Sequence, residues 1–222
     1  MKQLAEGVYQ LSGWPPNAIN VYLVDDVLVD AGTRQAEKRI LRQISGRKLS
    51  THVLTHAHPD HQGSSHAICE RFSIPLWCGR DDVPAVERVG GISNPKAPAL
   101  LNKVQARWWT GPPHPVAKAL SEGDQVAGFT VLETPGHSIG HIALWRESDR
   151  TLILGDVLNN MNVHTGVPGL HQPPDMFTPD PVRNRASARR LAALRPELVC
   201  FGHGAPLRDP DKLAAFVATL PA

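Results

Sequence analysis

Short apolar runs bounded by turn residues are the dominant hydrophobic pattern of this chain. The runs at 8–11, 19–24 and 27–29 come first, and the Asp25-Asp26 pair between the last two predicts a β-hairpin. Comparable runs predict further strands at 51–55, 74–78, 129–133, 142–145, 151–154 and 198–201. Both halves of the chain therefore contribute strands.

Helical segments are predicted between these strands, at 34–44, 63–72 and 182–194. A last helix is predicted to begin after Asp209, a good N-cap residue that Pro210 follows in the first helical position. Prolines interrupt residues 79–118, which predicts short helices and long loops there. Residues 159–179, rich in Pro and Gly, predict a long loop of the kind that often serves a site.

This order of strands and helices predicts a layered α/β domain, and no repeat or linker divides residues 1–222 into two domains. The composition agrees, because 41% hydrophobic and 20% charged residues are typical of a soluble globular domain and exclude a disordered chain or a coiled coil. A formal charge of +2 gives no reason to expect nucleic acid or a membrane surface as the partner.

The cysteines favour a cytoplasmic location. Cys69, Cys78 and Cys200 form no C-x-x-C pair and no disulfide framework, so we interpret them as reduced thiols. The first residues contain no long apolar segment of the secretory type. No apolar run approaches the ~18 residues of a membrane span.

The histidines give the first indication of chemistry. His56, His58, Asp60 and His61 lie within six residues that directly follow a predicted strand. Imidazole and carboxylate groups are ligands that divalent metals such as Zn²⁺ accept. His56 and His58 share a face of an extended segment, whereas Pro59 turns the chain and directs the next two ligands elsewhere. The spacing predicts a metal site.

Three further ligands stand in similar settings. His137 follows a predicted strand in Thr-Pro-Gly-His, Asp156 follows one in Gly-Asp, and His203 follows one in Gly-His-Gly. Strand ends are where α/β proteins place most of their active-site side chains. The seven groups suit two ions, each with three side chains and with one carboxylate shared between them.

In this order and spacing, the motifs resemble those of the metallo-β-lactamase superfamily of metal-dependent hydrolases. The resemblance spans residues 56–203 and, with the flanking elements, nearly the whole chain. It implies a four-layer αββα sandwich with the metals at one edge of the two sheets. The lack of a Cys ligand and the short chain point to a single-domain protein of the glyoxalase II-like and lactonase-like branch.

The resemblance also implies how the ligands divide between two divalent ions. One ion takes three histidines, His56, His58 and His137. The other ion takes an aspartate and two histidines, Asp60, His61 and His203. A second aspartate, Asp156, bridges the two ions. A hydroxide between the ions is the implied nucleophile, because bound Zn²⁺ lowers the pKa of water to roughly 7. Asp60 is the implied catalytic residue that orients it. Zinc is the expected metal, with iron or manganese as alternatives.

We expect the substrate to be a small molecule bound between loops. The predicted substrate-binding residues are Trp14, Asn159, Leu170, Met176 and Phe177. A mostly apolar wall suits a neutral ester, lactone or thioester. Two alternatives stay open: a phosphodiesterase, which the arginine-rich 182–194 segment motivates, and a persulfide dioxygenase with one iron on three histidines.

The remaining histidines have open roles. His141 is either a hydrogen-bond partner of a metal ligand or a structural residue, and His164 and His171 either line the pocket or stand apart from it. His52, His66 and His114 carry no ligand pattern and are interpreted as surface or structural residues. The sequence leaves open whether the protein forms a homodimer.

Overall fold

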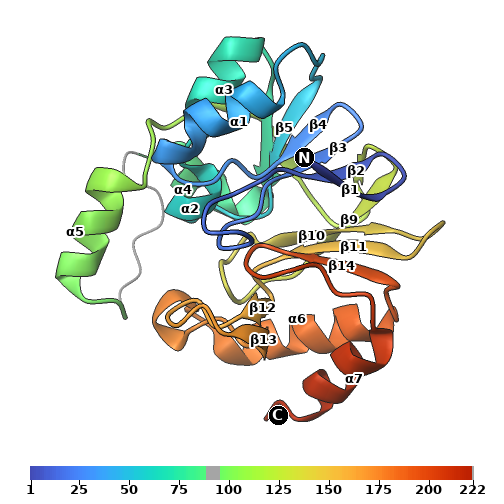
Figure 1. Cartoon of the computed structure of the whole chain (residues 1–222). Coiled ribbons are helices and arrows are strands. Elements are labelled where there is room, and N and C mark those ends of the chain that lie inside the picture. The colour runs from blue at the N-terminus through green and yellow to red at the C-terminus, as the bar shows by residue number, and fades with distance from the viewer. Residues whose placement is uncertain (89–95, 222) are drawn as a thin grey trace.

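Two mixed β-sheets form the centre of the structure, a computed structural model that describes residues 1–88 and 96–221 (Figure 1). The seven-stranded sheet contains, in order, β1 (Lys2–Ala5), β2 (Val8–Gln10), β3 (Tyr22–Val24), β4 (Val27–Val29), β5 (Thr51–Leu54), β6 (Leu76–Gly79) and β7 (Val116–Leu120). Neighbouring strands are antiparallel from β1 to β4 and parallel from β4 to β7.

The five-stranded sheet comes from the second half of the chain. Its order is β14 (Leu198–Phe201), β11 (Thr151–Gly155), β10 (Ile142–Arg146), β9 (Phe129–Glu133) and β8 (Gln125–Val126). The β11–β14 pair is parallel and the other pairs are antiparallel. Most predicted strands are thereby confirmed to within one to three residues, whereas β1, β7 and β8 were not predicted.

Alternation along the strands builds the layers. Tyr22 and Val29 point into a core between the two sheets, whereas Leu23 and Leu28 belong to a second core on the outer face. In the other sheet, Ile153 joins the central core and its neighbours pack outward. Both sheets are therefore buried on both faces, which explains their nearly continuous apolar runs.

Helices cover the two outer faces. The 3₁₀ turn η1 (Arg34–Ala36), α1 (Glu37–Gln43) and α3 (Ser65–Phe72) lie over the seven-stranded sheet, and α6 (Pro181–Ala193) and α7 (Pro210–Ala218) lie under the other (Figure 1). The Asp209 carboxylate accepts a hydrogen bond from the Lys212 amide at 2.8 Å, so the predicted N-cap is confirmed. The four-layer αββα sandwich is confirmed.

The irregular regions contain more structure than the sequence indicated. Residues 159–179 form a hairpin of β12 (Asn159–Met161) and β13 (Pro168–His171), followed by the turn η3 (Asp175–Phe177). These strands have no apolar alternation, which is why they were predicted as a loop. The proline-rich stretch forms η2 (Arg80–Asp82), α4 (Val83–Val86) and α5 (Ala99–Trp108); its residues 89–95 lie outside the described residues.

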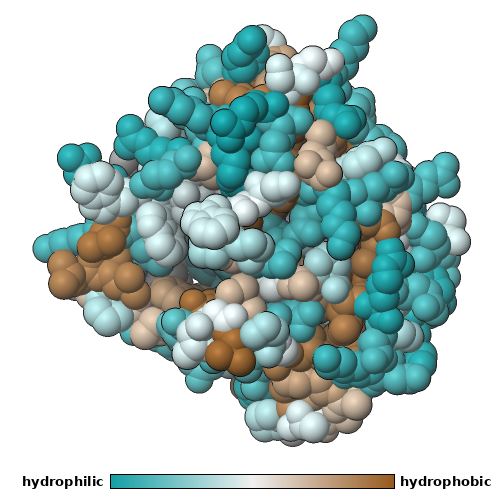
Figure 2. Space-filling model, in the orientation of Figure 1, coloured by the Kyte–Doolittle hydropathy of each residue, from teal (hydrophilic) through white to brown (hydrophobic). Residues whose placement is uncertain are grey.

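Helix α5 stands beside the sandwich and next to α2 (Pro59–Gln62) (Figure 1). Leu100 and Val104 give it an exposed apolar face, which appears as a brown patch in Figure 2. Leu101 and Gln105 lie on its other side and line the central pocket. Within the described residues, no helix combines the length and the apolar character that crossing a membrane requires.

Candidate metal centre

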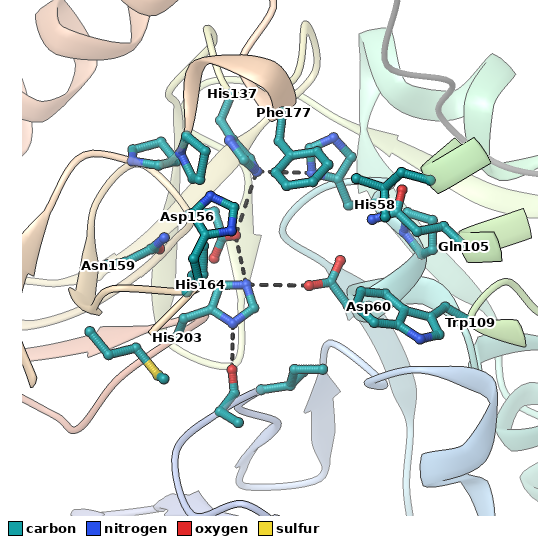
Figure 3. Close-up of a pocket in the computed structure, with 18 residues that line it drawn as sticks. His58, Asp60, Gln105, Trp109, His137, Asp156, Asn159, His164, Phe177 and His203 are labelled. Carbon is teal, nitrogen blue, oxygen red and sulfur yellow. Dashed lines mark hydrogen bonds and ion pairs between the residues drawn. The ribbon is translucent and has the colours of Figure 1, made fainter. Parts of the chain in front are cut away.

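The structure brings all seven predicted ligands together at one edge of the two sheets. The loop after β5 carries His56 and His58, Asp60 and His61 lie on the short helix α2 that follows, and the loops after β9, β11 and β14 carry His137, Asp156 and His203. Figure 3 shows His58, Asp60, His137, Asp156 and His203 around the pocket. One nitrogen from each of His56, His58 and His137 lies within 4.8 Å of the other two. The ligand atoms of Asp60, His61 and His203 are equally close to one another. Each group therefore joins residues of the 56–61 segment to a residue from the second half of the chain.

Asp156 lies between the two sets of ligands. Its Oδ2 is 3.5 Å from His137 Nε2 and 3.0 Å from His203 Nε2 (Figure 3), and 3.6 Å from His61 Nε2. Asp60 reaches His203 Nε2 at 3.3 Å from the pocket side. Asp156 therefore contacts histidines of both predicted ligand sets.

Hydrogen bonds on the outer side of the rings orient three histidines. His61 Nδ1 donates to Asp30 Oδ2 at 2.8 Å, His137 Nδ1 donates to Thr178 Oγ1 at 3.2 Å, and His203 Nδ1 donates to the carbonyl of Ala18. Each bond places a ring proton on Nδ1 and turns Nε2 towards the centre of the site.

His56 is oriented through Thr55. The Thr55 hydroxyl donates to Asp30 Oδ2 at 2.9 Å, so it accepts the Nδ1 proton of His56 at 3.0 Å. Asp30 therefore supports two ligands, His61 directly and His56 through one hydroxyl. Its own conformation is unusual, with a φ of +60°, directly after β4.

Buried lone pairs in the centre of the site show that the residues fit cations. Four buried atoms of the predicted ligands have no hydrogen-bond partner among the described residues: His56 Nε2, His58 Nε2, His61 Nε2 and Asp156 Oδ1. His58 Nδ1 also lies only 2.9 Å from His137 Nε2. Leaving such groups unpaired in a buried site is costly, whereas a divalent cation binds their lone pairs.

Burial and charge separate the histidines into two groups. Burial lowers the pKa of His56 and His137 well below the ordinary value, and neighbouring histidines lower it further. Burial also opposes protonation of His203, but Asp156 and Asp60 outweigh it and raise its pKa to about 10. Asp156 and Asp30 likewise raise the pKa of His61. The neutral histidines and the carboxylate-paired ones match the two predicted ligand sets.

Two glycines allow the close approach of these groups. A Cβ on Gly202 would lie 1.9 Å from Asp156 Oδ1, and a Cβ on Gly155 would lie 2.6 Å from His141 Nε2. Gly155 also has a φ of +58°, which side chains disfavour. Only glycine fits at these two strand ends.

Sequence reasoning missed three supporting residues. Asp30 directly follows a predicted strand, the same signal that singled out Asp156. Asp82, fully buried, accepts hydrogen bonds from the Ala57 amide at 3.0 Å and from Ser138 Oγ at 2.7 Å, and so joins two ligand-bearing loops. Thr178, within the predicted long loop, had no signal in the sequence.

A cavity of about 330 Å³ opens onto the ligands. Asn159 and Phe177, two of the predicted substrate-binding residues, line it, and so does His164 (Figure 3). The other three, and His171, are not among its described lining residues: Trp14 is 87% exposed, Leu170 packs against the outer core of the five-stranded sheet, and Met176 is half-buried on the turn η3. Apolar character alone does not show which way a loop side chain points, so substrate contact by Trp14, Leu170 and Met176 stays a prediction that the pocket lining does not support.

The αββα fold and the cluster of histidines and aspartates at the edge of the sheets are those of the metallo-hydrolase superfamily. Residues 14–203 match the model of the metallo-beta-lactamase superfamily, so the chain belongs to this family. A probable metallo-hydrolase of Bacillus subtilis, YflN, is 30% identical over 233 residues that cover 92% of this chain and 86% of that protein.

Two further similarities concern chemistry and metal. A hydroxyacylglutathione hydrolase of Bdellovibrio bacteriovorus is 29% identical over 114 residues, which cover 50% of this chain and 35% of that protein. The solved structure of TTHA1623 in a di-iron-bound form superposes with a TM-score of 0.62 at 30% identity, and the match covers 93% of each chain. The first of these similarities agrees with the glyoxalase II-like branch that the resemblance implied.

Proposed function

We propose that this protein is a dinuclear metal-dependent hydrolase that cleaves a small, neutral carboxyl derivative: an ester, a lactone or a thioester. The observation that carries the proposal is a pair of three-ligand sets that share Asp156 at the base of an apolar pocket. The similarity to a hydroxyacylglutathione hydrolase, whose name denotes hydrolysis of an acylated glutathione, supports the thioester in particular.

Two divalent cations fit the ligand sets, with zinc as the first choice. His56, His58 and His137 would hold one, and Asp60, His61 and His203 the other. Nitrogen and carboxylate ligands suit zinc, iron and manganese alike, and the di-iron form of TTHA1623 supports iron as the alternative. Bound ions of this kind act as Lewis acids and lower the pKa of water to roughly 7.

Asp60 is the proposed catalytic residue of the chain. It lies at the pocket wall, and although burial opposes its ionisation, His203 and His61 lower its pKa below the ordinary value. As a carboxylate it accepts a hydrogen bond from the attacking water and orients it. Asn159, on the opposite wall, places an amide where it can donate a hydrogen bond to the substrate carbonyl oxygen.

The lining of the pocket favours a neutral substrate. Its described residues include apolar side chains such as Leu101, Trp109, Met161, Val163 and Phe177, and no Lys or Arg. Such walls exclude water from the reacting group and add no lysine or arginine that would bind a phosphate. An acyl group or lactone ring of modest size is therefore the preferred class.

The two alternatives have less support. The arginines that motivated a phosphodiesterase lie on α6, where Arg189 donates to the Leu220 carbonyl and Arg190 pairs with Glu122, and neither is among the described lining residues. A mononuclear iron dioxygenase needs one set of three histidines only. The second set, built around Asp60 and His203, speaks for two ions.

The test is a substrate panel on protein loaded with zinc, iron or manganese. It contains p-nitrophenyl acetate, γ- and δ-lactones, an acylglutathione and bis(p-nitrophenyl) phosphate, with the metal content measured for each sample. We expect turnover of one carboxyl class, and a fall of roughly 10²-fold or more for Asp60→Asn. Asp26→Asn, in an exposed hairpin turn, is the matched control. Equal turnover by Asp60→Asn and the wild type, or faster phosphodiester cleavage, would contradict the proposal.

A further inference from the structure

A second cluster of metal-ligating side chains lies outside the pocket. His66 and Glu70 are one turn apart on α3, and His114 comes from the loop that joins α5 to β7. Residues four apart on a helix face the same side, so both α3 side chains are presented to the loop. None of the three is among the described residues that line the pocket.

The distances in this cluster match a metal shell. His66 Nδ1 and His114 Nδ1 lie 3.2 Å apart, and the three ligand atoms, one from each residue, lie within 4.8 Å of one another. Two nitrogens bound to a tetrahedral zinc at 2.0–2.1 Å are separated by about 3.3 Å. The two rings are inclined by 65°, so they meet edge to face and do not stack.

We propose that His66, Glu70 and His114 form a further binding site for a zinc-like divalent cation, separate from the paired site in the pocket. Two imidazoles and one carboxylate supply three ligands, and water completes a four-coordinate shell. Partial burial and the neighbouring His66 lower the pKa of His114, which keeps its imidazole neutral and able to bind a metal near pH 7.

The place of this site in the fold indicates its role. The loop that carries His114 directly follows α5 and Trp109, and both contribute to the pocket wall. This loop already packs tightly against the segment before α3, since a Cβ on Gly111 would lie 2.1 Å from the Gly63 carbonyl oxygen. A cation bound between His114 and α3 therefore links the segment that follows α5 to the sandwich, as a structural metal site beside the pocket.

The experiment measures zinc stoichiometry and thermal stability of the full chain at defined free zinc. The variants are His114→Gln and Glu70→Gln, and His171→Gln is the control, because His171 belongs to none of the metal-ligating groups of the described residues. We expect each variant to bind one equivalent fewer than the wild type, or to bind it at least tenfold more weakly, and to show a smaller rise in Tm when zinc is added.

Several outcomes separate this proposal from the hydrolase proposal. If a variant loses one equivalent of zinc but keeps the pocket ions and its turnover, the result supports the structural metal site at His66, Glu70 and His114, independently of the hydrolase proposal. Equal stoichiometry and equal zinc-induced rise in Tm for the wild type and both variants overturns it, whatever the catalytic result. Glu70 is exposed, so Glu70→Gln is expected to fold even where His114→Gln does not. Equal melting of the metal-free forms verifies folding.

Discussion

His141 accepts a hydrogen bond from the backbone amide of Asp156, with 3.1 Å between its Nε2 and the amide nitrogen. Its other ring nitrogen lies 2.8 Å from Thr134 Oγ1, so the ring proton is on Nδ1. Burial lowers the pKa of His141 to about 3, which keeps the ring neutral. Of the two roles left open by the sequence, the hydrogen bond favours support of the central carboxylate.

Replacing His141 is expected to weaken metal binding through Asp156. His141→Leu removes the acceptor and leaves the Asp156 amide unpaired, whereas His141→Gln can keep an acceptor near the same place. We expect metal affinity to fall roughly 10- to 100-fold for the leucine variant and less for the glutamine variant. Titration with a competing chelator measures both. Equal affinities in the two variants would show that the hydrogen bond does not position the carboxylate.

Asp30 is predicted to be needed for metal binding although it contacts no metal site directly. Asp30→Asn keeps the size of the side chain but removes the charge that holds the Nδ1 proton of His61. A 10- to 100-fold loss of metal affinity is expected, because second-layer partners of metal-bound histidines have effects of about this size. Asp26→Asn, in the exposed hairpin turn, is the control. A chelator titration that gives the wild-type value for Asp30→Asn would refute this role.

Gly202→Ala is predicted to displace Asp156. The added methyl group would lie 1.9 Å from Asp156 Oδ1, a distance that no relaxed structure allows. We expect loss of at least one metal ion per chain and of most turnover, measured by elemental analysis and by the substrate panel. Gly13→Ala is the control, because the nearest atom to its Cβ is 3.4 Å away. Full metal content in Gly202→Ala would contradict the packing argument.

His52 is predicted to make stability depend on pH. It is fully buried between the Leu28 carbonyl and Ser65 Oγ, and burial lowers its pKa to about 4. The unfolded chain binds this proton near pH 6.5, so the stability contributed by neutral His52 is full above that pH. It is lost as the pH falls towards 4, by roughly 3 kcal/mol in total.

The variant His52→Asn tests this pH dependence. Urea unfolding of both chelator-treated proteins between pH 4 and 7 separates this residue from the metal ligands. The variant is expected to be less stable at pH 7, since it loses packing, but to lose less stability than the wild type on acidification. Parallel pH profiles would show that His52 does not contribute.

The element order could be predicted from local pattern, and the exceptions have a common cause. Strands such as β5 and β11 are buried on both faces, so their nearly continuous apolar runs can be recognised from the local sequence alone. The hairpin of β12 and β13 has no such run: its two strands pair with each other, and the Asn160 amide donates to the His203 carbonyl at 2.8 Å. His203 is distant from Asn160 in the sequence, so no local pattern indicates this contact.

The sequence by itself determined the local chemistry: His56, His58, Asp60 and His61 follow one strand so closely that covalent geometry holds them near one another. The tertiary structure alone decided which distant groups support them, such as Asp30 and Thr178, and which loop residues face the pocket. It also brought His66 and His114 within 3.2 Å. The reason is that contacts across layers depend on the packing of whole sheets and helices, and the order of residues within one segment does not specify that packing.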